Sequence, residues 1–149
     1  MMLNTKLSIL AVLLFSVMVY PQSLNNKIQS KLNQQKDTPE EIFSRIEEGF
    51  SLGDVEKFSE FFSSQTYASL ASGISGYYSS NQFYYVLQNY FSIYKPINFR
   101  VVNSNSKSDN PYASGYYKYE SKGIRGTAMV FISLKLFGSH WKISQITIN

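Results

Sequence analysis

The most regular alternation of apolar and polar residues begins at Ala128. Every second residue from there to Leu136 is apolar, and a period of two predicts a strand with one face in the core. Gly138-Ser139 follows, and a glycine in first place favours a two-residue type II′ hairpin turn. In the next segment, Trp141 to Ile148, the apolar residues change sides half-way, so we expect a bulge near Ser144-Gln145. The other elements must cover the apolar face of this long, bent hairpin.

Two helices are predicted ahead of it. Thr38 is the expected N-cap of the first, Pro39 takes the first helical position, and Glu41 completes a capping box. Gly53 interrupts this helix, and Asp54 is the expected cap of a second, short helix. The apolar residues expected on the inner faces of the two helices are Ile42, Phe43, Ile46, Phe50, Val55, Phe58, Phe61 and Phe62.

The middle of the chain is harder to interpret. Residues 66–70 favour a short strand, and residues 72–76 are a loop by composition. Ser79 or Ser80 caps a third helix, which ends before Pro96 and buries Phe83, Val86, Leu87, Tyr90 and Phe91.

Alternating strands then follow Pro96. Ile97, Phe99 and Val101 lie on one face of the first, residues 103–111 form a polar loop, and residues 112–120 form the next strand. The order is helix, helix, short strand, helix, and four antiparallel strands. This order predicts an α+β domain in which three helices pack on one antiparallel sheet of four to five strands.

Residues 1–22 are predicted to be a signal peptide. Lys6 supplies the positive flank, and Leu7 to Tyr20 is an apolar run that is short for a membrane span. The cleavage site lacks a clean small-x-small pattern, so an uncleaved N-terminal anchor is the alternative and the only expected contact with a membrane. Residues 23–36 form a polar linker, and residues 37–149 form the folded domain. We therefore expect an exported protein, either periplasmic or secreted.

Charge is distributed unevenly along this domain. Residues 37–60 carry eight acidic and two basic residues, whereas residues 61–149 carry eight basic and two acidic residues. The pattern favours an acidic helical face beside a mildly basic sheet. The chain has three arginines and its lysines are spread out, so we expect no nucleic-acid partner.

Three features together resemble a known family. They are the two-helix start, the turn Phe-Ser-Leu-Gly-Asp at residues 50–54, and the ending Trp-Lys-Ile-Ser-Gln-Ile-Thr-Ile at residues 141–148. The chain resembles the secreted Bacteroidetes family called domain of unknown function 4783, within the nuclear-transport-factor-2-like, or cystatin-like, superfamily. The resemblance covers about residue 38 to residue 149 and implies a cone in which helices lean into a strongly curved sheet. It implies no catalytic residues.

Enzymes of that superfamily, such as ketosteroid isomerase and related dehydratases, use a carboxylate or histidine in the cone with tyrosine donors. His140 is the only histidine of this chain and follows a hairpin turn, where solvent is expected. Asp109 lies in a polar loop, and Glu120 lies beside a turn where Lys118 or Lys122 can pair with it. None is expected to be catalytic, although all three remain candidates.

Other chemistry is disfavoured by the residues present. The chain has no cysteine and a single histidine, so we expect no metal site and no cofactor. It has no Walker-type phosphate loop, because Gly73 and Gly76 are wrongly spaced and lack the lysine. A lipoprotein anchor is excluded because no cysteine follows the apolar run.

The many tyrosines could either line a ligand cavity or coat the sheet and the helix rim. If the cone is open, the expected ligand-binding residues are Arg100, Tyr116, Phe131 and Trp141, with Arg100 orienting an anionic or carbonyl group. The leading hypothesis is a non-catalytic module that binds a small apolar ligand or a protein partner. An isomerase- or dehydratase-type enzyme is the second hypothesis, and an envelope protein that forms homodimers through its sheet is the third.

Overall fold

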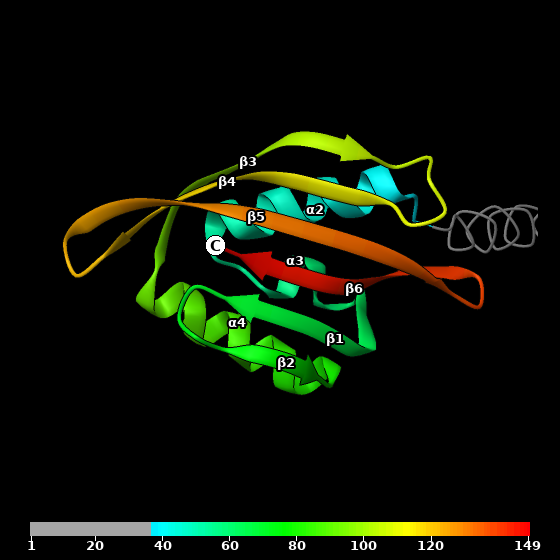
Figure 1. Ribbon diagram of the computed structural model, residues 1–149, viewed down its shortest axis with the longest axis horizontal. Helices are drawn as coiled ribbons and strands as arrows, with labels where there is room; N and C mark the ends of the chain where they lie inside the picture. Colours follow the sequence, from blue (N-terminus) through cyan, green and yellow to red (C-terminus); the bar gives the residue numbers. More distant parts are fainter. Residues whose placement is uncertain (1–36) are drawn as a thin grey trace, which may run out of the picture. The chain divides into compact units, whose positions relative to one another are not determined.

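The sheet determines how this domain is arranged. A computed structural model describes Asp37–Asn149, so the predicted signal peptide and linker lie outside the described residues. Within residues 37–149, six strands form one sheet in the order β2-β1-β6-β5-β4-β3, and three helices lie behind one face of it (Figure 1). The elements are α2 (Pro39–Leu52), α3 (Glu56–Ser59), β1 (Phe62–Leu70), β2 (Ser75–Tyr78), α4 (Ser80–Ile93), β3 (Lys95–Asn105), β4 (Tyr112–Ser121), β5 (Ile124–Phe137) and β6 (His140–Ile148). The α+β prediction is confirmed.

Two details of the predicted sheet are wrong. The sheet has six strands rather than four to five, because part of the predicted loop at residues 72–76 belongs to β2, which pairs antiparallel with β1. The sheet is also mixed, because β1 pairs parallel with β6. A parallel neighbour needs a long connection, and the chain between β1 and β6 contains α4 and three further long strands.

The helix starts follow local side-chain chemistry. The predicted capping boxes are present at Thr38 with Glu41 and at Ser79 with Gln82. Asp54 accepts a hydrogen bond from the backbone N–H of Glu56 at 3.1 Å, but the residue in the N-cap position of α3 is Val55. The helix α3 has only four residues, so the predicted second helix is shorter than expected.

The terminal hairpin has the predicted turn and bulge. Phe137 pairs with His140, and Gly138 between them has φ 61°, as the first position of a type II′ turn requires. Ser133 pairs with Gln145 and Leu134 with Ile143, which leaves Ser144 as the extra residue. The bulge keeps Ile143 and Ile146 on the same buried face, although residues three positions apart in a regular strand point to opposite faces.

Aromatic rings fill the space between the helices and the sheet. Phe50 of α2 is fully buried, and its ring lies 5.0 to 6.0 Å from the rings of Phe58, Phe91, Phe99 and Tyr117. Several of these pairs are edge-to-face or tilted, the arrangements that aromatic quadrupoles favour. Within residues 37–149, no helix has the length and apolar character needed to cross a membrane.

Candidate functional site

The buried interior offers neutral hydroxyl groups rather than charged ones. Among the described residues, the buried polar side chains are Ser63 and Thr66, and Thr66 donates a hydrogen bond to the backbone oxygen of Ile143 at 3.1 Å. Tyr117 donates to the backbone oxygen of Tyr94 at 2.5 Å. Burial raises the pKa of the Tyr117 hydroxyl far above its usual value of 10.0, so this group stays protonated. These hydroxyl groups already donate to backbone oxygens, and the part of the chain described places no carboxylate base in the interior.

The three predicted catalytic candidates do not meet at one place. Asp109 lies in the exposed β3–β4 loop, whereas Glu120 lies near the other end of β4, about 26 Å along the strand from Tyr112. Glu120 is 4.0 Å from the guanidinium of Arg125. His140 is exposed at the β5–β6 turn, where a ring nitrogen lies 3.3 Å from the Ser139 hydroxyl. This arrangement gives no shared acid–base site for the three residues.

The four predicted ligand-binding residues divide between the two faces of the sheet. Arg100 and Tyr116 are directly opposite each other on β3 and β4, and both are exposed. Phe131 of β5 lies on the same outer face and stacks on Tyr112 at 6.0 Å. Trp141 pairs with Leu136 and packs against the core, so it lies on the other face. A ligand-binding role for these residues stays a prediction.

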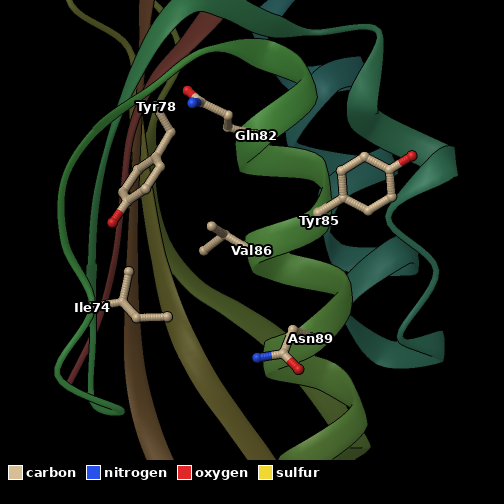
Figure 2. Close-up of a pocket in the computed structure, with 6 residues that line it drawn as sticks. All are labelled: Ile74, Tyr78, Gln82, Tyr85, Val86 and Asn89. Atoms are coloured by element: carbon tan, nitrogen blue, oxygen red, sulfur yellow. The ribbon is translucent and has the colours of Figure 1, made fainter.

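An apolar groove runs between β2 and α4, and we call it the β2–α4 groove (Figure 2). Its volume is about 410 Å³. Ile74 and Tyr78 form one wall, and Val86 extends towards them from α4. All three side chains are half-buried, so a bound molecule could cover their remaining apolar surface. The lining residues are Ile74, Tyr78, Gln82, Tyr85, Val86 and Asn89.

Two side-chain amides lie near the two ends of this groove. Gln82 and Asn89 are seven residues apart on α4, a rise of about 10.5 Å. The Oε1 atom of Gln82 accepts hydrogen bonds from the backbone and hydroxyl of Ser79, which directs its NH₂ group away from that cap. The groove also lies in a neutral region, because no charged residue occurs between Glu60 and Lys95. It therefore suits an uncharged, mainly apolar molecule.

A second hollow lies on the outer face of the sheet, and we call it the sheet-face pocket. Its volume is about 490 Å³. Unlike the β2–α4 groove, it mixes aromatic rings, amides, a hydroxyl and one ammonium group. The lining residues are Gln65, Tyr67, Tyr77, Lys135, Phe137, Ser144 and Gln145.

A third, smaller hollow of about 290 Å³ lies between α2 and β3 and includes Glu40 and Glu47. Glu47 already accepts a hydrogen bond from the backbone of Val101 at 3.3 Å, and Glu40 accepts one from Ser106. The hydrogen bond from Ser106 lowers the pKa of the Glu40 carboxyl. In the described part of the chain, no three His, Cys, Asp or Glu residues gather as a metal site.

Sequence reasoning missed most of the residues that line the two larger hollows. Ile74 was assigned to a loop and Val86 to the buried stripe, although Ile74, Gly76 and Tyr78 alternate with the period of a strand. That alternation is the signal that could have identified β2. Lys135 and Gln145 gave no comparable signal, because polar residues on an outer strand face are ordinary.

The sequence also matches a family model. The model called domain of unknown function (DUF4783) matches residues 43–149. The chain belongs to this family. No match was found among curated proteins. DUF4783 membership confirms the resemblance seen in the sequence and leaves the activity open, since the function of the family is unknown.

Solved structures support the fold of this DUF4783 chain. A DUF4783 protein from Bacteroides uniformis is 14% identical, with a TM-score of 0.64 over 71% of this chain and 94% of that one. A protein from Catenulispora acidiphila with a ketosteroid isomerase-like fold, in complex with trimethylamine, is 13% identical, with a TM-score of 0.59 over 76% and 86%. A cystatin-fold protein from Novosphingobium aromaticivorans is 8% identical, with a TM-score of 0.58 over 76% and 98%. At these identities the likeness concerns the fold alone.

Proposed function

We propose that this DUF4783 domain is a binding module that holds a small, mainly apolar ligand in the β2–α4 groove. The observation that carries the proposal is the apolar lining of this groove within an uncharged part of the domain. The interior between helices and sheet is packed with rings such as Phe50 and Phe91, which supports a ligand site outside this core. The groove volume lies within the range of about 300–1,000 Å³ that is usual for small-molecule sites.

Affinity and orientation have different sources in this site. Covering the exposed parts of Ile74, Tyr78 and Val86 removes apolar surface from water, which is the main favourable term. Gln82 and Asn89 would then hydrogen-bond polar groups at the two ends of the ligand. We therefore propose a ligand about 10 Å long, with an apolar middle and a polar group near each end.

The experiment is native mass spectrometry of the protein purified from its own host, compared with two variants. Val86→Lys places an ammonium group in the groove, whereas Gln88→Lys adds the same charge at an exposed position of α4 outside it. We expect a co-purified small mass in the wild type and in Gln88→Lys, and its loss from Val86→Lys, because burying an unpaired charge is costly.

Nile red, a neutral apolar dye, gives a readout that does not depend on the natural ligand. We expect saturable fluorescence with the wild type and Gln88→Lys, and weak fluorescence with Val86→Lys. An equal response from all three folded proteins, together with no co-purified mass, would show that the groove is not the binding site.

A further inference from the structure

We propose that the sheet-face pocket is a second binding site, and that it takes an acidic saccharide through ring stacking and a lysine contact. This inference is independent of the β2–α4 groove, because the two hollows share no lining residue. Four observations support it: the shape of the sheet, the aromatic rings, the side-chain amides and the lysines.

The pocket lies where two irregularities of the sheet meet. On β6, Ser144 is the extra residue of the bulge opposite β5. On β1, the pairing with β6 passes from Phe62–Ile143 to Tyr67–Gln145, so β1 uses five residues where β6 uses two. Regular strands present an even surface, whereas bulges bend a strand and redirect its side chains. Gln65 and Ser144 both belong to these irregular segments and both line the pocket.

Aromatic rings form the walls of the pocket. The rings of Tyr67 and Tyr77 lie 5.2 Å apart at 60° and so make an angled corner. The hydroxyl of Tyr67 lies within hydrogen-bond distance of Ser75, at 3.1 Å, which holds its ring in place. Tyr77 is 72% exposed and Phe137 is 43% exposed, so both rings have surface that a ligand can contact. The negative face of an aromatic ring attracts the weakly positive C–H groups of a pyranose ring.

Side-chain amides supply the polar contacts that a sugar needs. Gln145 donates a hydrogen bond to Thr147 at 3.1 Å, which fixes the amide and leaves its Oε1 atom as an acceptor for a ligand hydroxyl. Gln65 brings a second amide to the same pocket. An amide can donate and accept at once, which matches the paired hydroxyl groups of a saccharide.

The charge of the pocket selects an acidic sugar. Lys135 is its one charged lining residue, and within residues 37–149 it makes no ion pair. Lys142 lies directly opposite on β6 and donates to the backbone oxygen of Glu60 at 2.6 Å. Like charges that face each other across two strands are destabilising. A carboxylate on the ligand would pair with Lys135 and relieve that repulsion.

Isothermal titration calorimetry with trigalacturonic acid tests the proposal, and its methyl ester is the neutral control ligand. We expect the acid to bind the wild type, and Lys135→Met to weaken binding about tenfold, because it removes the charge-assisted hydrogen bond to the ligand carboxylate. Lys118→Met is the matched control, since Lys118 is exposed on β4 and does not line the pocket. Tyr77→Ala should also weaken binding strongly, because it removes a ring that lines the pocket. Circular dichroism should show that each variant is folded.

Each other outcome counts against the proposal. Equal affinity for the acid and its methyl ester would refute the lysine contact. An equal loss in Lys118→Met and Lys135→Met would indicate non-specific attraction to a basic sheet. No binding of either ligand by the folded wild type would refute the proposal of a saccharide site. This result would leave the Nile red test of the β2–α4 groove unaffected.

Discussion

Two buried tyrosines, Tyr90 and Tyr117, differ in what their hydroxyl groups contact. Tyr117 donates to the backbone oxygen of Tyr94, the C-cap residue of α4, whereas the Tyr90 hydroxyl has no hydrogen-bond partner among the described residues. We expect Tyr117→Phe to lower the free energy of unfolding by about 1 kcal/mol, because it removes a hydrogen bond. Tyr90→Phe should leave that free energy unchanged or raise it. Urea denaturation of the two variants is the measurement, and an equal loss in both would contradict the difference in partners.

The same two residues predict how stability depends on pH. Burial raises the pKa of both hydroxyls above the value of 10.0 expected in the unfolded chain. The unfolded chain therefore loses these protons first, so their stabilising contribution is complete below pH 10 and declines as pH rises above it. We expect the urea midpoint to fall between pH 9 and pH 11. Absorbance at 295 nm should show these two tyrosines ionising only when the protein unfolds; early ionisation would refute their burial.

At the scale of single elements, the helices depend on their caps. The Thr38 hydroxyl accepts a hydrogen bond from the backbone of Glu41, and the Glu41 carboxylate accepts one from the backbone of Thr38. We expect Thr38→Ala to destabilise the domain by about 1 kcal/mol, since N-cap substitutions cost about 0.5–2 kcal/mol. Ser44→Ala, at an exposed position of the same helix, is the control for thermal denaturation. If both variants lose the same stability, the cap is not the cause.

Local chemistry explains which elements the sequence predicted. Thr38 and Ser79 predicted the starts of their helices, because each caps a backbone N–H only three residues away. Gly138 predicted its turn, because a residue without a side chain adopts the positive φ that the turn requires. The strand β2 was missed because serine and glycine dominate residues 72–76 and obscure the alternation. The parallel pairing of β1 with β6 has no local signal, since the pattern of a strand specifies its buried face but not its neighbour.

The candidate sites were less predictable than the fold. Strand parity did not predict that Arg100 and Tyr116 lie directly opposite each other, because alternation within a strand does not specify which residues pair. Trp141 shares the parity of the buried Ile143, and it packs on the core side, away from those two residues. The β2–α4 groove joins residues of β2 and α4, and no pattern within either segment specifies how closely they approach.

At the scale of the whole chain, the predicted export gives a further test. We propose that the mature protein begins near Ser23, because the apolar run and its positive flank are typical of a cleaved signal. Intact-mass measurement of the protein from its host should show the loss of residues 1–22. A mass that includes these residues would favour the uncleaved anchor instead.

Acidic and basic residues lie on different sides of the described domain. The acidic residues of 37–60 lie on and around α2 and α3, whereas the basic residues of 95–142 belong to the strands and their loops, and Figure 1 shows these helices behind the sheet. An anionic molecule is therefore attracted towards the sheet side, and salt should weaken this attraction. The asymmetry agrees with an acidic ligand in the sheet-face pocket.

The parallel pairing of β1 with β6 also determines when the domain can assemble. The hairpin β1–β2 is connected to β5, β4 and β3 only through β6. Phe62 of β1 can pair only after Ile143 of β6 has been synthesised. Before β6 is present, no strand can hydrogen-bond to both β1 and β5, so the two parts of the sheet cannot be joined. Contacts of such long sequence separation form late and slowly. We therefore propose that the sheet is completed only after β6 has been synthesised, and this late step fits the export proposed above, because a chain must be unfolded to pass a translocation channel.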